Sequence, residues 1–214
     1  MLTTKQNPER HAESYSWMIF YFPSNRGYRD HASGLLLDFK SNSKPYVSAW
    51  TNSIIKEIDN LPDIDIVVRV LGSEELTASG DEPLDILGKE IAKAKGGKYC
   101  SKCLTKKRHH QPLKSMQKYQ RQSEIKDLYE FSIEKSSDVI RLLIIDDVMT
   151  TGTSLMEICN EIRKKYSKKE IIIHLFSIAR TASLNNEDLQ RESGHNQKFI
   201  DKHKFPSLID LLDF

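Results

Sequence analysis

The most constraining feature of this sequence is the segment 142–155, in which an apolar run is followed at once by two acids and a loop of small hydroxyl residues. It reads Leu-Leu-Ile-Ile-Asp-Asp-Val-Met-Thr-Thr-Gly-Thr-Ser-Leu. We expect a buried strand over 139–145 that brings Asp146 and Asp147 to its carboxyl edge, then a short loop, then a helix that begins near Ser154. Hydroxyl groups, peptide N–H groups and a helix N-terminus can together bind a phosphate, and a glycine lets the backbone come close to it. Two carboxylates beside such a loop predict a sugar phosphate ligand, with its hydroxyls on the acids.

The rest of the chain alternates between strand and helix patterns. Further strands are expected at 16–22, 64–71, 128–133 and 170–178, and helices at 46–58, from Pro83 to the glycines at 96–97, and at 155–166. This alternation predicts an α/β fold with a mainly parallel central sheet flanked by helices, and a small hood formed by the termini. The length predicts a single domain over 1–214, with a basic loop without clear periodicity at about 98–126 and a C-terminal appendage at about 183–214 that ends in a short helix from Pro206.

Composition excludes several classes of protein. Hydrophobic residues make up 38% of the 214 residues, which is too much for a wholly disordered chain. The apolar runs are far shorter than the ~18 residues of a membrane helix, and the first fifteen residues have no apolar signal region. Three cysteines cannot form a disulfide framework. We therefore expect a cytoplasmic protein with no membrane partner.

Positive charge is concentrated in one block. From Lys89 to Lys126 there are twelve Lys and Arg residues against two Glu, a net charge of +10, whereas the whole chain carries +2. Such a block suits an anionic partner such as a nucleotide phosphate, pyrophosphate or nucleic acid. The alternative is a solvated loop without a partner.

The 142–154 segment also has a simple alternative, a solvated strand end followed by an ordinary turn and helix cap. The glycine-rich dinucleotide fingerprint and the Walker-type phosphate loop are both absent. The two halves of the segment occurring together, directly after an apolar strand, favour the ligand site.

The same segment resembles the thirteen-residue phosphoribosyl pyrophosphate (PRPP) signature of type I phosphoribosyltransferases: four apolar residues, two acids, two apolar residues and Thr-Thr-Gly-Thr-Thr/Ser. Every position of 142–154 fits it by residue type. The resemblance implies that Asp146 and Asp147 hold the ribose hydroxyls, one of them close to the reacting anomeric carbon. It implies a 5′-phosphate site made by Thr150, Thr151, Gly152, Thr153 and Ser154, with Mg²⁺ carried by the pyrophosphate.

A weaker likeness over about 15–182 is similar to the ComF-like branch, which resembles the phosphoribosyltransferase half of amidophosphoribosyltransferases. Its markers are Gly34-Leu-Leu-Leu-Asp-Phe-Lys40, the strand at 66–71 with its loop, and Ile178-Ala-Arg-Thr-Ala182. In that branch the basic stretch corresponds to a flexible loop that closes over PRPP. The residues implied here are Lys106, Lys107, Arg108, Gln111 and Arg121.

The pyrophosphate loop implied by the family departs from its usual basic character. It falls on Leu71, Gly72, Ser73 and Glu74, followed by Glu75. Two glutamates beside a highly charged leaving group repel it unless Mg²⁺ bridges them, which counts against catalysis more than against binding.

A second small cluster has zinc-ligand residue types. Cys100 and Cys103, followed by His109 and His110, give four ligand types within eleven residues, but without the usual longer gap between ligand pairs. The preferred interpretation is coincidence in a lysine-rich loop, with neither a zinc site nor a redox pair.

Two functions from different classes remain. The leading hypothesis is an enzyme that binds Mg²⁺–PRPP and joins its C1 to a nitrogen nucleophile with release of pyrophosphate. The alternative is a catalytically weak PRPP or nucleotide sensor, or an effector module of a system for DNA uptake or bacterial defence, which binds a nucleic acid or a partner protein through 98–126. The sequence does not fix the oligomeric state, and a homodimer is one option because sheet-based enzymes of this kind often pair.

Overall fold

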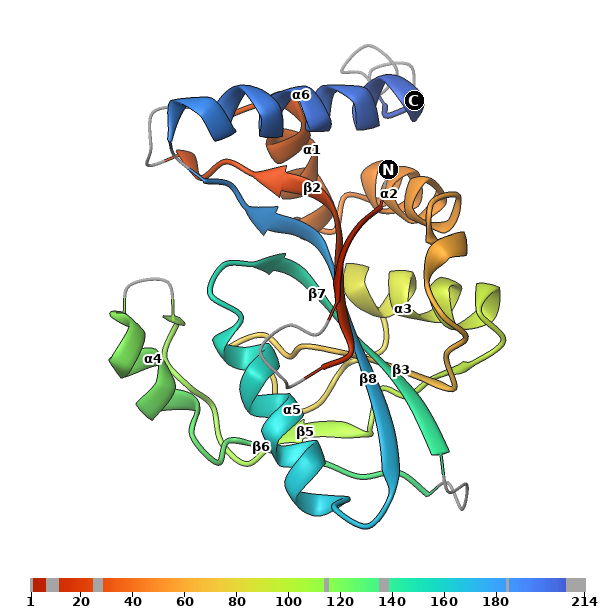
Figure 1. Cartoon of the computed structure of the whole chain (residues 1–214), viewed down its shortest axis with the longest axis vertical. Coiled ribbons are helices and arrows are strands. Elements are labelled where there is room, and N and C mark those ends of the chain that lie inside the picture. The colour runs from red at the N-terminus through yellow and green to blue at the C-terminus, as the bar shows by residue number, and fades with distance from the viewer. Residues whose placement is uncertain are drawn as a thin grey trace.

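The core of the protein is a six-stranded sheet, seen nearly edge-on in Figure 1. The computed structural model describes residues 2–6, 12–24, 29–113, 116–134, 139–183 and 185–206. The strand order is β1 (Thr3–Gln6), β2 (Ser14–Tyr21), β8 (Glu170–Thr181), β7 (Val139–Met149), β3 (Ile66–Arg69) and β4 (Lys98–Tyr99). Only the β1–β2 pair of this sheet is antiparallel. The predicted α/β class with a mainly parallel central sheet flanked by helices is confirmed.

Helices cover both faces of the sheet. One face packs against α1 (His31–Lys40), α2 (Lys44–Ile55), the short η2 (Ile58–Asn60) and α3 (Pro83–Ala94). The other face packs against α5 (Thr153–Lys165) and the two-stranded hairpin β5 (Leu104–Lys106) and β6 (Tyr129–Phe131), with α4 (Lys118–Ile125) beside α5. The helix α6 (Asn186–Lys202) lies across α1 and β2 at one end of the molecule (Figure 1).

Apolar periodicity explains these elements. The strands β7 and β8 are apolar along most of their length because helices bury them from both sides. In α5, Leu155, Ile158 and Ile162 repeat at helical spacing and are all buried. Phe199 of α6 stacks on Trp50 of α2, with ring centroids 5.6 Å apart, which fixes α6 to the body of the domain.

The connections reverse direction between β3 and β7. The chain leaves β3 toward α3 on one face of the sheet and leaves β7 toward α5 on the other. At such a switch point the loops after the two strands separate and leave a crevice at their carboxyl ends, which is where ligands bind in open α/β sheets.

Several boundaries differ from the sequence prediction. Strand β7 continues four residues past 145, through Asp146 and Asp147, because its pairing with β8 continues as far as Met149. The 98–126 segment is not one irregular loop, since it contains β4, β5 and α4. Helix α1 was not predicted, and the helix expected from Pro206 falls on 207–214, outside the described residues.

Among the helices of the described part of the chain, none is both long and apolar enough to cross a membrane.

Candidate functional site

A cleft of about 590 Å³ lies at the switch point. Its walls come from the end of α1, the end of β3 and the loop after it, the start of α3, the segment 110–113, and the segment that includes Asp146, Asp147 and Ser154. This volume is in the range of small-molecule sites. Residues from both segments that the sequence singled out, 71–74 and 146–154, therefore line one common space.

The strand–loop–helix segment has the geometry of an anion site. Gly152 has φ +71°, a left-handed conformation, and it is the N-cap of α5, so the first peptide N–H groups of that helix have no partner within the helix. The hydroxyls of Thr151 and Thr153 are 2.7 Å apart, and Thr150 accepts a 3.0 Å hydrogen bond from Thr181. Free helical N–H groups, hydroxyls and the positive end of the helix dipole together favour a phosphate here.

The five predicted phosphate residues do not all face the main cleft. Ser154 lines it, whereas Thr151 and Thr153 line a smaller cavity of about 160 Å³ between α4 and α5. The start of α5 is therefore open on two sides.

The two aspartates differ in their surroundings. Burial raises the pKa of Asp146 to about 8, and the negative charge of Asp147 adds to this rise. Asp147 is neutralised by Lys40 at the end of α1, with 2.5 Å between Nζ and Oδ2. Each carboxylate also accepts one peptide N–H, from Asp147 and Val148 respectively. Within the described part of the chain, Asp146 accepts one peptide N–H and has no basic partner in an ion pair.

Lys40 belongs to the Gly34–Lys40 marker, but its contact with Asp147 was not predicted. No spacing rule connects positions 107 residues apart, so only the packing of α1 against the sheet brings them together.

The loop after β3 corrects an expectation about its charge. The sequence predicted that Glu75 would repel an anion in the cleft, but its carboxylate is bound to Arg69 by two hydrogen bonds of 2.7 and 2.5 Å. It also accepts the peptide N–H of Gly72 at 2.7 Å. Burial opposes the charge on Glu75, yet the guanidinium and this N–H outweigh it and hold its pKa below the usual value. Glu74, by contrast, is exposed.

Arg69 is a functional-site neighbour that the sequence prediction missed. It is 4% exposed, and its guanidinium binds Asp85 at 2.8 Å as well as Glu75. Asp85 in turn accepts a hydrogen bond from Tyr99 and the peptide N–H groups of Gly80 and Glu82. The available signal was a single charge within the apolar run Ile-Val-Val-Arg-Val-Leu of residues 66–71, since a buried arginine requires anionic partners.

The predicted lid residues divide into separate groups. Lys106 is 5% exposed and belongs to β5, so it is not on a surface loop. Arg108 is tied to Glu124 of α4, and Arg121 donates to the carbonyl of Met116 at 2.8 Å. Among the described residues, the lining of the cleft includes His110. It does not include these two arginines or the exposed Lys107 and Gln111.

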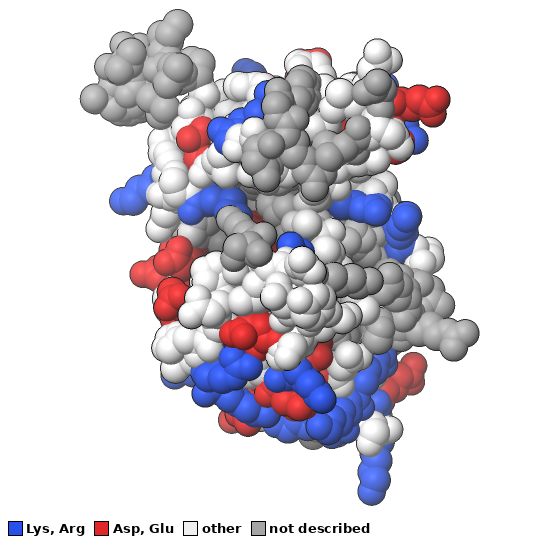
Figure 2. Space-filling model, turned by 90° about the vertical axis from the view of Figure 1, so that its left-hand side faces the viewer, with Lys and Arg blue, Asp and Glu red and all other residues white. Residues whose placement is uncertain are grey.

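The face of the molecule shown in Figure 2 carries both signs of charge. In the view of Figure 2, Lys and Arg gather toward the lower end, where they are mixed with Asp and Glu. Helix α5 ends with Arg163, Lys164 and Lys165 at the same end of the molecule in Figure 1. Basic residues at a helix C-terminus are stabilised by the helix dipole. The dipole is therefore a sufficient reason for basic residues at the end of α5, and no anionic ligand is needed to explain them.

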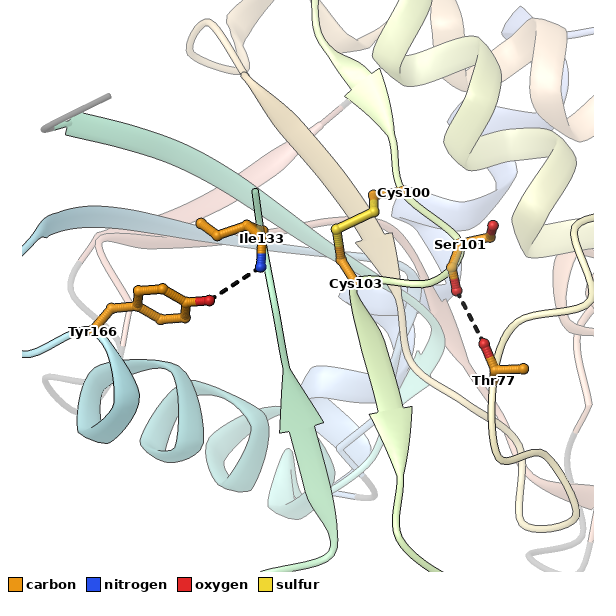
Figure 3. Close-up of a disulfide and its surroundings, with 6 residues drawn as sticks. All are labelled: Thr77, Cys100, Ser101, Cys103, Ile133 and Tyr166. Carbon is orange, nitrogen blue, oxygen red and sulfur yellow. Dashed lines mark hydrogen bonds between the residues drawn. A yellow bond between two sulfur atoms is a disulfide. The ribbon is translucent and has the colours of Figure 1, made fainter. Parts of the chain in front are cut away.

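The expected cysteine chemistry is wrong. Cys100 and Cys103 form a disulfide in the turn between β4 and β5 (Figure 3), whereas the preferred interpretation of the sequence was a coincidence of two cysteines in a lysine-rich loop. Sulfurs bonded to each other cannot act as thiolate ligands, so the proposed set with His109 and His110 loses both of its sulfur donors. The third cysteine is free and buried in α5.

No group of three or more metal-ligand side chains occurs in the described part of the chain. Asp146 and Asp147 supply carboxylate oxygens, the donor type that Mg²⁺ prefers, but Asp147 is shared with Lys40. These residues fit a magnesium ion that is held mainly by a ligand's phosphates rather than one held in a protein cage.

No family model and no curated protein matches this chain. Similar solved structures include adenine phosphoribosyltransferase from Leishmania tarentolae, with 11% identity over 82% of this chain and 94% of that chain and a TM-score of 0.37. Another is the adenine phosphoribosyltransferase from Trypanosoma brucei in complex with AMP, pyrophosphate and ribose-5-phosphate, with 11% identity over 71% of this chain and 79% of that chain and a TM-score of 0.32.

Proposed function

We propose that this protein is a phosphoribosyltransferase-like enzyme that binds Mg²⁺–PRPP and transfers its phosphoribosyl group to a nitrogen nucleophile. The observation that carries the proposal is the single cleft shared by Asp146, Asp147, the start of α5 and the loop after β3. The two aspartates would accept hydrogen bonds from the ribose hydroxyls, and the start of α5 would bind the 5′-phosphate. The loop after β3 would bind the pyrophosphate that leaves. The sequence markers of the ComF-like branch are part of the same proposal.

The ribose 5-phosphate part of the substrate would lie along the β7–α5 segment. The 5′-phosphate would accept hydrogen bonds from the N-terminal peptide groups of α5 and the hydroxyls of Thr150, Thr151, Thr153 and Ser154. The ribose hydroxyls would donate to Asp146 and Asp147, which satisfies the acid that is left without a cation in the cleft.

The reaction would be a substitution at the anomeric carbon. The bond between C1 and the pyrophosphate oxygen breaks, with its electron pair leaving on pyrophosphate, and the lone pair of the acceptor nitrogen forms the new bond to C1. The acceptor nitrogen then loses its proton. Positive charge develops on the ribose ring in between, and the carboxylate of Asp146 or Asp147 stabilises it electrostatically. The contribution of the protein is orientation and charge, without a covalent intermediate.

Magnesium would be held by the substrate's phosphates and reached by the carboxylate oxygens of Asp146 or Asp147. When bound, it supplies neutralisation of the departing pyrophosphate. Lys40 would hold the side chain of Asp147 in place in the absence of ligand.

The alternative as a sensor without turnover loses its main support. It depended on repulsion of pyrophosphate by Glu74 and Glu75, and the Glu75 carboxylate is bound to Arg69. We therefore favour the enzyme.

The test is calorimetric titration of Mg²⁺–PRPP into the wild type, Asp147→Asn and Asp63→Asn, with pyrophosphate release assayed in the same samples. Asp63 is an exposed aspartate that precedes β3 and pairs with Arg141 near the start of β7, so its variant controls for the loss of one negative charge. We expect binding and slow pyrophosphate release by the wild type and Asp63→Asn, and loss of binding in Asp147→Asn. Binding without release in the presence of a panel of nitrogen acceptors would support the sensor, and no binding by the wild type would refute the proposal.

A further inference from the structure

One buried lysine stands directly behind the loop that follows β3. Lys106 donates from Nζ to the carbonyl oxygens of Gly72, at 2.5 Å, and Ser73, at 2.9 Å. The carbonyl of Ser73 also accepts the peptide N–H of His110 at 3.4 Å. Lys107, the next residue in the chain, is exposed, as expected from the alternation of side chains in a strand.

These contacts fix the direction of two peptide groups. The described chain has no cis peptide bond, so in each peptide the N–H points away from the C=O. When the carbonyls of Gly72 and Ser73 point back at Lys106, the N–H groups of Ser73 and Glu74 point to the opposite side of the loop. Gly72 and Ser73 line the cleft, whereas Lys106 lies behind them. Within the described part of the chain, neither of these two N–H groups has a hydrogen-bond acceptor.

Successive N–H groups that point into one concavity bind anions. The charges nearby favour this use of the loop, because the carboxylate of Glu75 is paired with Arg69 and the ammonium of Lys106 lies on the far side of the same peptides. Glu74 is the other acidic side chain of this loop, and it is exposed.

We propose that Lys106 is a positioning residue, which holds the peptides of 72–74 so that the N–H groups of Ser73 and Glu74 bind the pyrophosphate end of the substrate. This inference rests on the proposed function and assigns a structural cause to its leaving-group site. Within the basic segment, Lys106 then acts as one fixed, buried cation behind the site.

The hairpin that carries Lys106 is held in place on several sides. The peptide N–H of Lys106 donates to Leu76 at 2.8 Å, and Thr105 bridges to Thr77. The disulfide lies at the start of β5 (Figure 3), and the carbonyl of Cys103 accepts the peptide N–H of Ser132, next to β6. These contacts set the position of the ammonium before any ligand arrives.

The test compares two probes that engage different ends of the site, Mg²⁺–pyrophosphate and ribose 5-phosphate, by titration calorimetry. Lys106→Met should weaken pyrophosphate binding at least about tenfold, as expected for loss of a charged hydrogen-bond donor, and leave ribose 5-phosphate affinity unchanged. Lys106→Arg should recover part of the pyrophosphate affinity, and Lys107→Met, the matched surface control, should change neither affinity.

Four results would overturn the inference. If Lys106→Met weakens the binding of both probes equally, the substitution damages the site in general. If its pyrophosphate affinity is unchanged, Lys106 has a purely structural role. In both cases, binding of ribose 5-phosphate by the wild type leaves the proposed function intact. If Lys106→Met does not fold, amide NMR of the wild type decides: pyrophosphate must shift the Ser73 and Glu74 N–H signals, and their constancy would refute the inference. Failure of the wild type to bind either probe would refute the proposed function as well.

Discussion

Replacing Arg69 tests whether the loop after β3 is built around a buried ion network. The guanidinium is 3% exposed, and it binds Asp85, which is 0% exposed, and Glu75, which is 26% exposed. In Arg69→Met the side chain keeps much of its length, but two carboxylates lose their counter-ion.

Removal of one partner from a buried ion pair costs about 3–5 kcal/mol, because the remaining charge stays desolvated. For a chain of 214 residues, each kcal/mol corresponds to about 2–4 °C in the thermal midpoint. We therefore expect Arg69→Met to melt about 6–20 °C below the wild type. Glu75→Gln leaves Asp85 to neutralise the arginine, and should cost only about 1–2 kcal/mol.

Thermal melts followed by circular dichroism, with urea titrations for the free energy of unfolding, measure these effects. Arg141→Met is the matched control, because Arg141 also lies in a strand and pairs with two aspartates, Asp63 and Asp65, but its side chain is 40% exposed. Its midpoint should stay close to that of the wild type. If Arg69→Met melts no lower than Arg141→Met, the network does not stabilise the loop and the reasoning is wrong.

The remaining predictions concern single features. In the folded state the pKa of Asp146 is raised to about 8, above its unfolded value, so the stability of the wild type should fall as pH rises from about 4 to 8. Asp146→Asn lacks this titrating group. In thermal melts across that pH range, its stability relative to the wild type should therefore be highest at pH 8. The Cys100–Cys103 disulfide closes a very short loop and should contribute about 2 kcal/mol; without reductant, the denatured protein should take up one iodoacetamide by mass spectrometry, and three would disprove the pairing. In urea titrations, Gly152→Ala should lower the free energy of unfolding by about 1 kcal/mol, because φ at this position is +71°. Gly34→Ala should raise it by about 0.5–1 kcal/mol, because Gly34 lies in a helix interior with open space around it.

The α/β class and the β7–α5 segment followed from local sequence. A run of apolar residues can be stable only as a buried strand or helix, and the Thr-Thr-Gly-Thr-Ser loop after Asp146 and Asp147 has few conformations other than a turn into a helix. The strand end was misjudged at residue 145, since hydrogen bonds to β8, and not polarity, determine that β7 continues to Met149.

The sequence by itself determined the class of fold and the two carboxylates with their phosphate loop, because apolar periodicity and turn chemistry act over a few residues. Only the tertiary structure decided how charges pair. The partners Lys40 with Asp147, Arg69 with Glu75 and Asp85, and Lys106 with the 72–73 carbonyls come from different elements. The free energy of a buried charge depends on what lies within a few ångströms of it, and that is set by how the helices and the β5–β6 hairpin pack on the sheet.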